Sequence, residues 1–396
     1  MATIGAGIIG MGFMGQTHCR ALQSAQRDGY PVRLVAACDA NAQRRAGLIA
    51  AVGNIKSGPD TSEERLFDPA EVTGYASADE LLADDNVHLV HICTHTETHA
   101  DLAIRALHAG KHVIVEKPVA LRSSDVAKVV DASRRSGCLC MPAMCMRFWP
   151  GWSWLKECVD KEPFGPLKSI TFHRLARHPK WASEFYSDPR RSGGALFDLH
   201  IHDADLVRWI LGDPDEVFTA GSLDHVTTLY RYRKGPDHVV AEGGWDHSPG
   251  FAFRMRYVAV FERATADYDM LRTGQHLMLS HDETQDVINI ESGTGYDGEI
   301  RHMLEVLASG GSHPLAAAID EAEGVTRLLE AERRSVESGK PVSLARKART
   351  RTRASAAKSK SVRSTRKPAV KSKTRRAPSP RSRSSVASLR RARSGR

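Results

Sequence analysis

The chain has 396 residues with 56 Lys and Arg against 47 Asp and Glu, so its formal net charge is +9. Residues 346–396 contain 20 Lys and Arg and no acidic residue. Residues 1–345 therefore hold 36 basic and 47 acidic groups, a net charge of −11, and the mean charge describes neither part. The first part is long enough for two domains. Because no uncharged apolar run approaches the roughly 20 residues that span a bilayer, we expect no membrane protein.

The cysteines indicate the compartment. All seven lie between Cys19 and Cys158, an odd number confined to one half of the chain. This pattern fits reduced thiols better than a disulfide framework, so we expect a cytoplasmic protein. The apolar N-terminal segment lacks the basic start of a signal peptide and contains many glycines, which predicts folded structure there.

Residues 1–145 alternate between strand and helix patterns, as in a parallel α/β sheet. Ser77 and Glu80 fit a capping box that opens a short helix. A segment rich in Gly, Pro, Asp and Ser, residues 53–74, interrupts the alternation and predicts a loop insertion. We expect strands at 3–9, 32–38, 87–93, 112–115 and 138–144, and helices that begin after Gly12, run from about 98 to Gly110, and cover 124–136.

After Arg147 the pattern changes to that of an α+β domain. A loop rich in Trp, Tyr and Arg separates a strand at 168–173 from a helix through 205–211. Alternating segments across 215–290, clearest at 254–261 and 277–281, predict an antiparallel sheet with one face available for packing. Helices are expected at 152–159, 299–308 and 315–338. The predicted fold is α/β, with a doubly wound parallel sheet in 1–146, an α+β domain with a large open, mostly antiparallel sheet in 147–345, and a disordered basic tail in 346–396.

A glycine-rich turn follows the first predicted strand. Gly10, Gly12 and Gly15 form a G-x-G-x-x-G pattern between a strand and an amphipathic helix. In this setting Gly10 makes the tight turn, Gly12 lets the backbone approach a phosphate, and Gly15 lets the helix pack on the sheet. An overlapping register begins at Gly5, with too few residues before it for a central strand. The pattern predicts a dinucleotide-binding Rossmann domain.

The residues at the end of the second predicted strand bear on the preference between NAD and NADP. Asp39 stands where a carboxylate hydrogen-bonds the ribose hydroxyls of NAD and repels a 2′-phosphate. Arg44 and Arg45 lie just beyond it and would suit NADP. The sequence therefore favours NAD and leaves NADP open.

Two further motifs place reactive groups near that cofactor. Lys117, in Glu116-Lys117-Pro118, stands at the carboxyl end of a parallel strand, where ligands bind in open α/β sheets. Asp198 and His202 are four residues apart, so on a helix they would share a face, and the carboxylate would orient the imidazole. A solvated lysine, a helix N-terminal acid and a structural histidine are the alternatives.

Several ordered motifs together resemble the glucose-fructose oxidoreductase / inositol dehydrogenase / MocA-like (Gfo/Idh/MocA) family. The resemblance spans about residues 1–345. Its motifs are GIIGMGFMGQTH (7–18), CTHTETH (93–99), VEKPVAL (115–121), RFWP (147–150), GGALFDLHIHDADLVRWILGDP (193–214) and GKPVSL (339–344).

The resemblance implies an NAD(P)-dependent oxidoreductase that transfers a hydride between nicotinamide and a hydroxyl or carbonyl carbon of a sugar, polyol or inositol-like substrate. It implies that Lys117, Asp198 and His202 form the catalytic group. In this group we assign His202 as the general base and acid, Asp198 as its orienting partner, and Lys117 as a donor that stabilises developing alkoxide charge. It also implies a cis Lys117–Pro118 bond and a homodimer or homotetramer formed through the open sheet. The expected cofactor-binding residues are Gly10, Gly12, Phe13, Met14, Gly15, Asp39, Thr94, His99 and Glu116. The expected substrate contacts are Lys117, Arg147, His173, Arg174, Trp181, Tyr186, Asp198 and His202.

The sequence departs from the family in two places. His95 stands where the family usually has Pro, close to the expected nicotinamide, and the insertion at 53–74 is unusual. Two other functions on the same fold stay open: a redox-neutral NAD-dependent glycoside hydrolase, and a cofactor-binding regulatory protein without turnover.

A metal hydrolase is disfavoured. Acidic and histidine side chains gather between Asp198 and Asp205, but His200 and His202 would share a face only on a strand, and the apolar pattern that follows is helical. We therefore expect no metal site.

The basic tail predicts nonspecific binding to polyanions through phosphate neutralisation. It contains no aromatic residues that would stack on bases. A solvated tail without a specific role and an out-of-frame translation product explain the composition equally well.

Overall fold

The computed structural model describes residues 3–48 and 65–344. Every described helix and strand belongs to one compact unit. The basic tail and most of the predicted insertion lie outside the described residues, and the domain division at residue 146 stays a prediction. In the described part of the chain, no helix combines the length and apolar character that crossing a membrane requires.

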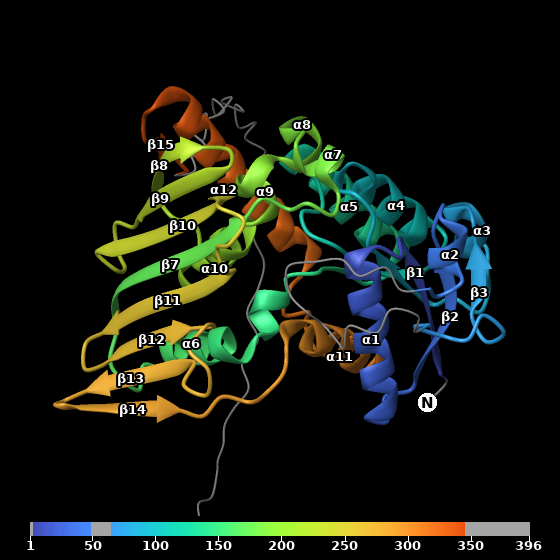
Figure 1. Ribbon diagram of the computed structural model, residues 1–396, viewed down its shortest axis with the longest axis horizontal. Coiled ribbons are helices and arrows are strands. Elements are labelled where there is room, and N and C mark those ends of the chain that lie inside the picture. Colours follow the sequence, from blue (N-terminus) through green and yellow to red (C-terminus); the bar gives the residue numbers. More distant parts are fainter. Residues whose placement is uncertain (1–2, 49–64, 345–396) are drawn as a thin grey trace, which may run out of the picture. The chain divides into compact units, whose positions relative to one another are not determined.

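Six parallel strands form the first sheet, in the order β3-β2-β1-β4-β5-β6 (Figure 1). The strands are β1 (Ile4–Ile9), β2 (Val32–Cys38), β3 (Thr73–Tyr75), β4 (Leu89–Ile92), β5 (His112–Val115) and β6 (Cys140–Pro142). The helices between them are α1 (Phe13–Arg27), α2 (Ala42–Arg45), α3 (Ala78–Leu82), α4 (Thr96–His108) and α5 (Ser123–Ser136). This order confirms the predicted doubly wound sheet. The strand order reverses between β1 and β4, which opens a ligand crevice at their carboxyl ends.

Local sequence explains the boundaries of these elements. Ser77 accepts a hydrogen bond from the Asp79 backbone at 3.2 Å while Glu80 reaches back to the Ser77 N–H, which is the predicted capping box. Gly137 ends α5 in the left-handed conformation, with φ +71°. All seven cysteines lie in described positions and carry free thiols.

Nine strands form the second sheet, in the order β14-β13-β12-β11-β7-β10-β9-β8-β15. The strands are β7 (Leu167–Arg177), β8 (Glu216–Ser222), β9 (His225–Arg231), β10 (His238–His247), β11 (Arg254–Phe261), β12 (Thr265–Asp269), β13 (Leu277–His281), β14 (Thr284–Ile288) and β15 (Val342–Ser343). β10 and β7 pair in parallel, and the other pairs are antiparallel. The sheet is therefore mostly antiparallel, as predicted.

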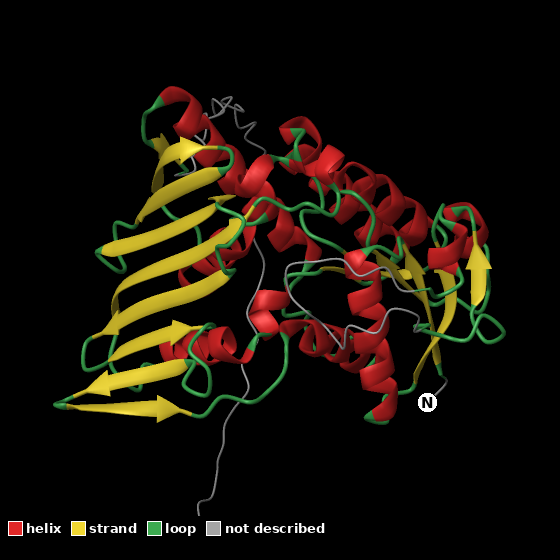
Figure 2. Cartoon of the chain, in the orientation of Figure 1, coloured by secondary structure: helices red, strands yellow, loops and turns green. Residues whose placement is uncertain are grey.

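One face of the second sheet packs on helices and the other is open (Figure 2). On β11, Met255, Tyr257 and Ala259 are buried, while the residues between them are half-buried. Trp152 is fully buried on the helical side and meets the rings of Tyr257 and Tyr268 at 5.6 and 4.4 Å. The helices after the first sheet are η1 (Cys145–Phe148), α6 (Pro150–Lys161), α7 (Ser183–Tyr186), α8 (Pro189–Ser192), α9 (Gly194–Asp198), α10 (Ile201–Leu211), α11 (Gly295–Ala308) and α12 (Ile319–Ser338).

The last two helices connect the sheets. α11 packs against α1 of the first sheet, and α12 packs against both α5 and β8. These contacts hold the carboxyl ends of the first sheet against the helical side of the second, which is where the pocket described below lies.

Candidate active site

The glycine-rich turn has the shape that a bound phosphate needs. Gly10 has φ +91°, and a Cβ on Gly15 would lie 1.9 Å from the Gly10 oxygen, so both positions require glycine. A Cβ on Gly12 would meet no atom within 4 Å. Gly12 is the N-cap of α1, which has no side-chain cap and no acidic residue in its first turn. The N–H groups of this helix start are therefore open to an anion, as a pyrophosphate requires.

Asp39 is fixed beside this turn at the end of β2. Its Oδ2 accepts from the Met11 N–H and its Oδ1 from the Asn41 N–H, both at 2.8 Å. Arg45 donates to the backbone oxygens of Asp39 and Ala40 at 3.2 and 3.0 Å. Its neighbour Arg44 lines the pocket. An acid that suits NAD and a cation that suits NADP thus lie at the same end of the site.

One pocket collects most of the predicted site residues. Its wall includes the helix start of α1, the ends of β4 and β5, and the segment between β7 and α10. Among the predicted residues, those that line it are Gly12, Phe13, Met14, Thr94, His99, Glu116, Lys117, Arg174, Trp181, Tyr186, Asp198 and His202. Gly10, Gly15, Asp39, Arg147 and His173 lie outside its lining.

Lys117 joins the two halves of the pocket. Its Nζ donates to the Asp198 backbone oxygen at 2.7 Å and to Asp198 Oδ1 at 3.2 Å. The Lys117–Pro118 bond is cis, as the resemblance implies. His99 places its ring nitrogens 2.9 Å from the Pro118 oxygen and 3.0 Å from the Thr94 oxygen. The residue expected to bind cofactor therefore also ties the β4 and β5 loops together.

The expectation that Asp198 and His202 share one helix is wrong. α9 ends at Asp198 and α10 begins at Ile201, with a turn at Leu199 between them. In the described residues Asp198 contacts Lys117, no hydrogen bond joins it to His202, and His202 Nδ1 has no partner. Two glycines with positive φ just before this segment start a short helix that stops early, which periodicity alone does not reveal.

His202 is held neutral. Burial lowers its pKa well below the usual 6.5, and the nearby Lys117 and Arg174 lower it further. A neutral imidazole with an unpartnered nitrogen, in a pocket with an ammonium, is suited to accept a proton from a bound hydroxyl.

Two arginines expected to contact substrate form buried ion pairs instead. Arg174 makes a bidentate pair with Asp203, at 3.0 and 2.8 Å. The same residue also lines the pocket. Arg147 makes a bidentate pair with Asp205, at 2.8 and 2.6 Å, and also contacts Glu321. The role expected for Arg147 is therefore corrected to a structural one, because the residue is 3% exposed and its guanidinium donates to Asp205, Glu321 and the Ala316 oxygen.

The same ion pairs separate the acidic and histidine side chains between Asp198 and Asp205. Asp203 and Asp205 serve the two arginines. His200 turns its Nε2 to Tyr230 Oη and Glu332 Oε2, each at 3.1 Å. Asp203, Asp205 and His200 thus take part in three separate buried contacts and do not converge on one point.

An aromatic segment covers the pocket next to the glycine-rich turn. The Trp181 ring lies 6.2 Å from that of Phe13, and Phe185 stacks on His95 at 4.6 Å with the planes 8° apart. Sequence reasoning missed Phe185 and noted His95 only as a departure. His95 is the N-cap of α4 and stands where the family usually has proline. Its imidazole provides the ring on which Phe185 stacks.

A buried polar cluster lies behind Lys117. His18 Nε2 is 3.0 Å from Glu116 Oε1, and His18 Nδ1 is 3.0 Å from His91 Nδ1. Glu116 Oε2 in turn accepts from the Lys117 backbone N–H at 3.1 Å. Glu299 of α11 lies nearby with no hydrogen-bond partner on either oxygen in the described residues, and burial followed by the charge of Glu116 raises its pKa well above 4.5. Glu299 therefore holds a proton more readily than a solvent-exposed glutamate does.

The fold and this pocket define a nucleotide-binding protein of the Rossmann class. Residues 4–144 match the Gfo/Idh/MocA family, described as an oxidoreductase family with an NAD-binding Rossmann fold, and residues 152–246 match its C-terminal domain. These two matches cover more than half of the chain. The chain belongs to the Gfo/Idh/MocA oxidoreductase family.

Named relatives act on polyols and sugars. Myo-inositol 2-dehydrogenase of Thermotoga maritima is 34% identical over 41% of this chain and 49% of its own length. 1,5-anhydro-D-fructose reductase of Ensifer adhaerens is 30% identical over 41% and 50%. Inositol 2-dehydrogenase of Salmonella typhimurium is 28% identical over 61% and 64%. The chain thus matches about half to two thirds of the length of these curated relatives.

Solved structures share the fold. Levoglucosan dehydrogenase in complex with NADH and levoglucosan superposes with a TM-score of 0.70 at 19% identity, covering 87% of this chain and all of that one. UDP-N-acetylglucosamine 3-dehydrogenase from Acidithiobacillus ferrooxidans gives a TM-score of 0.67 at 21% identity, covering 85% and 99%. Both likenesses support the two-sheet architecture.

Gly12 and Gly15 allow cofactor binding to be separated from folding. We expect Gly12→Ala to keep the melting temperature and to weaken NADH binding about tenfold or more, because its methyl group occupies only the open space that the phosphate needs. Gly15→Ala is expected to destabilise the protein, since its methyl group meets the Gly10 oxygen. Thermal melts and NADH fluorescence titrations measure both effects. A Gly12→Ala protein that binds NADH normally would contradict this assignment of the turn.

The raised pKa of Glu299 predicts a pH-dependent stability. Its raised pKa gives stability that is fully present below the unfolded pKa near 4.5 and is lost as the pH rises through the folded pKa. Glu299→Gln lacks this loss, so the free energy of unfolding of the variant should gain on the wild type by up to about 1.4 kcal/mol per pH unit above pH 4.5. Urea unfolding measured from pH 5 to 8 tests this, with the exposed Glu283→Gln as control. A difference that does not change with pH would refute it.

Proposed function

We propose that this protein is an NAD(P)-dependent oxidoreductase that transfers a hydride between nicotinamide and a hydroxyl or carbonyl carbon of a sugar, polyol or inositol-like substrate. The observation that carries the proposal is the meeting of Lys117, Asp198 and His202 in one pocket beside an open glycine-rich helix start. The dehydrogenase and reductase names of the relatives support the same reaction class.

The cofactor site fits a dinucleotide. The start of α1, at Gly12, Phe13 and Met14, would hold the pyrophosphate, and the Asp39 carboxylate would face the adenosine ribose. The nicotinamide supplies the hydride acceptor or donor when bound. Asp39 favours NAD, whereas Arg44, which lines the pocket, is the cation that would accept the 2′-phosphate of NADP.

Proton transfer is assigned to His202. Its neutral imidazole takes the hydroxyl proton as the carbonyl forms and returns it in the reverse direction. The ammonium of Lys117 has three N–H groups, and Asp198 accepts at two oxygen positions, which leaves one N–H for the substrate oxygen. That N–H stabilises the negative charge that develops on the oxygen. Asp198 therefore serves as the positioning residue of Lys117 rather than of His202.

The aromatic segment suits the substrate class. Trp181 and Tyr186 line the pocket and meet edge to face at 5.7 Å. Their apolar ring faces suit the C–H faces of a sugar or cyclitol ring, while Lys117 and His202 supply polar contacts to its hydroxyls.

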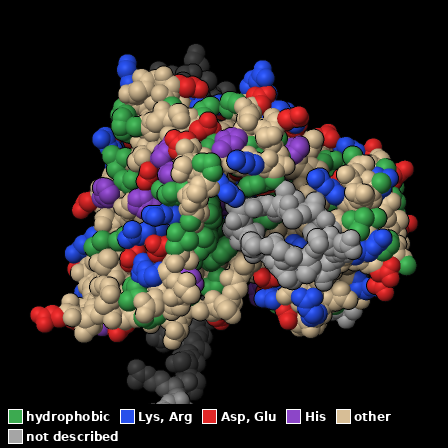
Figure 3. Space-filling view, in the orientation of Figure 1, with side chains coloured by type: hydrophobic (Ala, Val, Ile, Leu, Met, Phe, Trp, Pro, Cys, Tyr) green, Lys and Arg blue, Asp and Glu red, His purple; other side chains and the backbone are tan. Residues whose placement is uncertain are grey.

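The open face of the second sheet is the proposed oligomer contact. A row of half-buried, mostly apolar side chains crosses five neighbouring strands in register, and Figure 3 shows this face in view. Its members are Phe218, Leu229, Val240 and Val258, with Thr171 between the last two. A second copy that covers this row would form a homodimer, or a homotetramer with further contacts.

Substitution of the two proposed catalytic side chains tests the function. We expect Lys117→Met and His202→Asn each to lower turnover by about 10²–10⁴-fold while NADH binding persists, because both groups act on the substrate oxygen. Turnover is measured on the sugar, polyol or inositol that the wild-type protein oxidises best, and binding by NADH fluorescence.

Lys128→Met and His108→Asn are the matched controls, since both residues are exposed and lie outside the pocket. Near-normal turnover in both pocket variants would refute the assignment. A loss of NADH binding as large as the loss of turnover would place the two residues in cofactor binding instead.

A further inference from the structure

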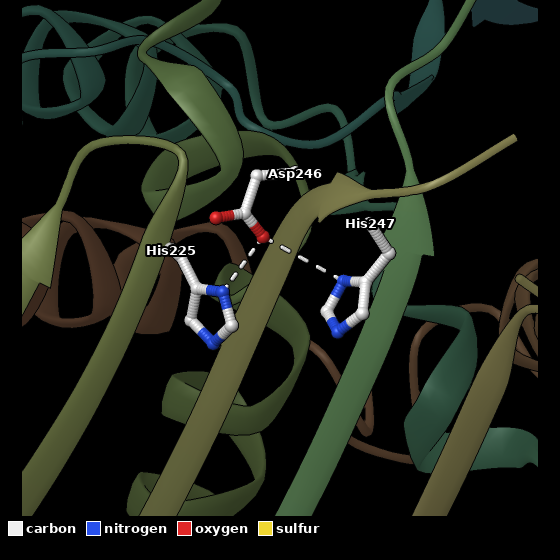
Figure 4. A group of neighbouring side chains, drawn as sticks. All are labelled: His225, Asp246 and His247. Atoms are coloured by element: carbon white, nitrogen blue, oxygen red, sulfur yellow. Dashed lines mark hydrogen bonds and ion pairs between the residues drawn. The ribbon is translucent and has the colours of Figure 1, made fainter.

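A second group of chemically active side chains lies on the second sheet, outside the pocket. His225 begins β9, and Asp246 and His247 end β10. One ligand atom from each of the three lies within 4.8 Å of the others (Figure 4). Asp246 Oδ1 stands between the rings, 2.7 Å from His225 Nδ1 and 3.6 Å from His247 Nδ1. Two imidazoles and a carboxylate therefore converge on one point.

The contacts behind this group fix its two rings. His225 Nε2 is 3.0 Å from Glu242 Oε1, and the other oxygen of Glu242 is 2.9 Å from His173 Nδ1. His247 stacks on the Phe251 ring at 4.1 Å. A carboxylate behind an imidazole is the arrangement that sets the tautomer and basicity of metal-bound histidines.

The backbone also holds the group in place. β10 pairs with β9 on one side and β7 on the other, and Gly244 lies opposite His225. The β10–β7 register shifts between Gly244 and His247, and such a bulge re-aims the side chains that follow it. His247 Nδ1 also lies 3.2 Å from the Ala176 oxygen, and this contact fixes the orientation of the ring.

We propose that His225, Asp246 and His247 bind one divalent transition-metal ion of the Zn²⁺ type. Imidazole and carboxylate ligands suit Zn²⁺, Co²⁺ and Ni²⁺, and a His₂Asp set leaves a position open for water or another ligand. Two neutral imidazoles and one carboxylate leave a net charge of +1 at the ion, which Glu242 offsets from behind His225. The site joins the β9 and β10 strands and is independent of the proposed hydride transfer.

Metal titration of the full chain, without an affinity tag, tests the proposal. We expect Co²⁺ to give visible d–d absorption bands that saturate at one equivalent per chain, and Zn²⁺ to displace them. His225→Ala and Asp246→Ala should each weaken binding about tenfold or more, and Glu242→Gln should weaken it by about 10–100-fold through the second contact of His225.

His281→Ala is the matched control. Like His225, His281 is a half-buried histidine of this sheet paired with two carboxylates, Asp282 and Asp286, but among the described residues no second histidine joins them. It should leave the titration unchanged, and Zn²⁺ should raise the melting temperature of the wild type but not of His225→Ala. Wild-type binding no tighter than that of a His225→Ala/Asp246→Ala protein, or equal losses in the His281→Ala control, would overturn the proposal.

Discussion

The contact between the Lys117 ammonium and Asp198 holds the site together. Lys117 follows β5 of the first sheet, and Asp198 ends α9 beside the second, so two hydrogen bonds of 2.7 and 3.2 Å connect the two sides of the pocket. His99 fixes the loop around the lysine, and Glu116 fixes its backbone N–H. Movement at either end would carry the ammonium away from a bound oxygen.

Buried charge pairs keep that geometry rigid. α10 supplies both Asp203 and Asp205, which engage Arg174 and Arg147 with side chains that are 2% exposed or less. Removing one partner of such a pair leaves an uncompensated buried charge, so these contacts fix the orientation of α10 and of His202 at its start. The positive charge of Arg174 also helps to keep that imidazole neutral.

Local sequence patterns predicted the strands and the two sheets well, because the signals that begin and end each strand lie within a few residues of it. β2, β5, β11 and β13 begin and end where the sequence indicates, and both sheets have the predicted character. The site was predicted less completely. Asp198 and His202 lie four apart in the sequence, but the helix breaks after α9, and Asp198 accepts hydrogen bonds from Lys117 instead. The paired role of Arg147, the stacking of Phe185 on His95, and the convergence of His225 with Asp246, 21 positions away, depend on tertiary contacts that one sequence does not display.

Deuterium transfer tests the central claim most directly. The purified protein is incubated with NAD and with sugars, polyols and inositols that carry deuterium on each carbinol carbon, and the reduced nicotinamide is analysed by mass spectrometry. The account predicts deuterated NADH in an amount equal to the ketone or aldehyde formed. Product release without net NADH, as in redox-neutral glycoside hydrolysis, or cofactor binding without oxidation of any substrate, would contradict it.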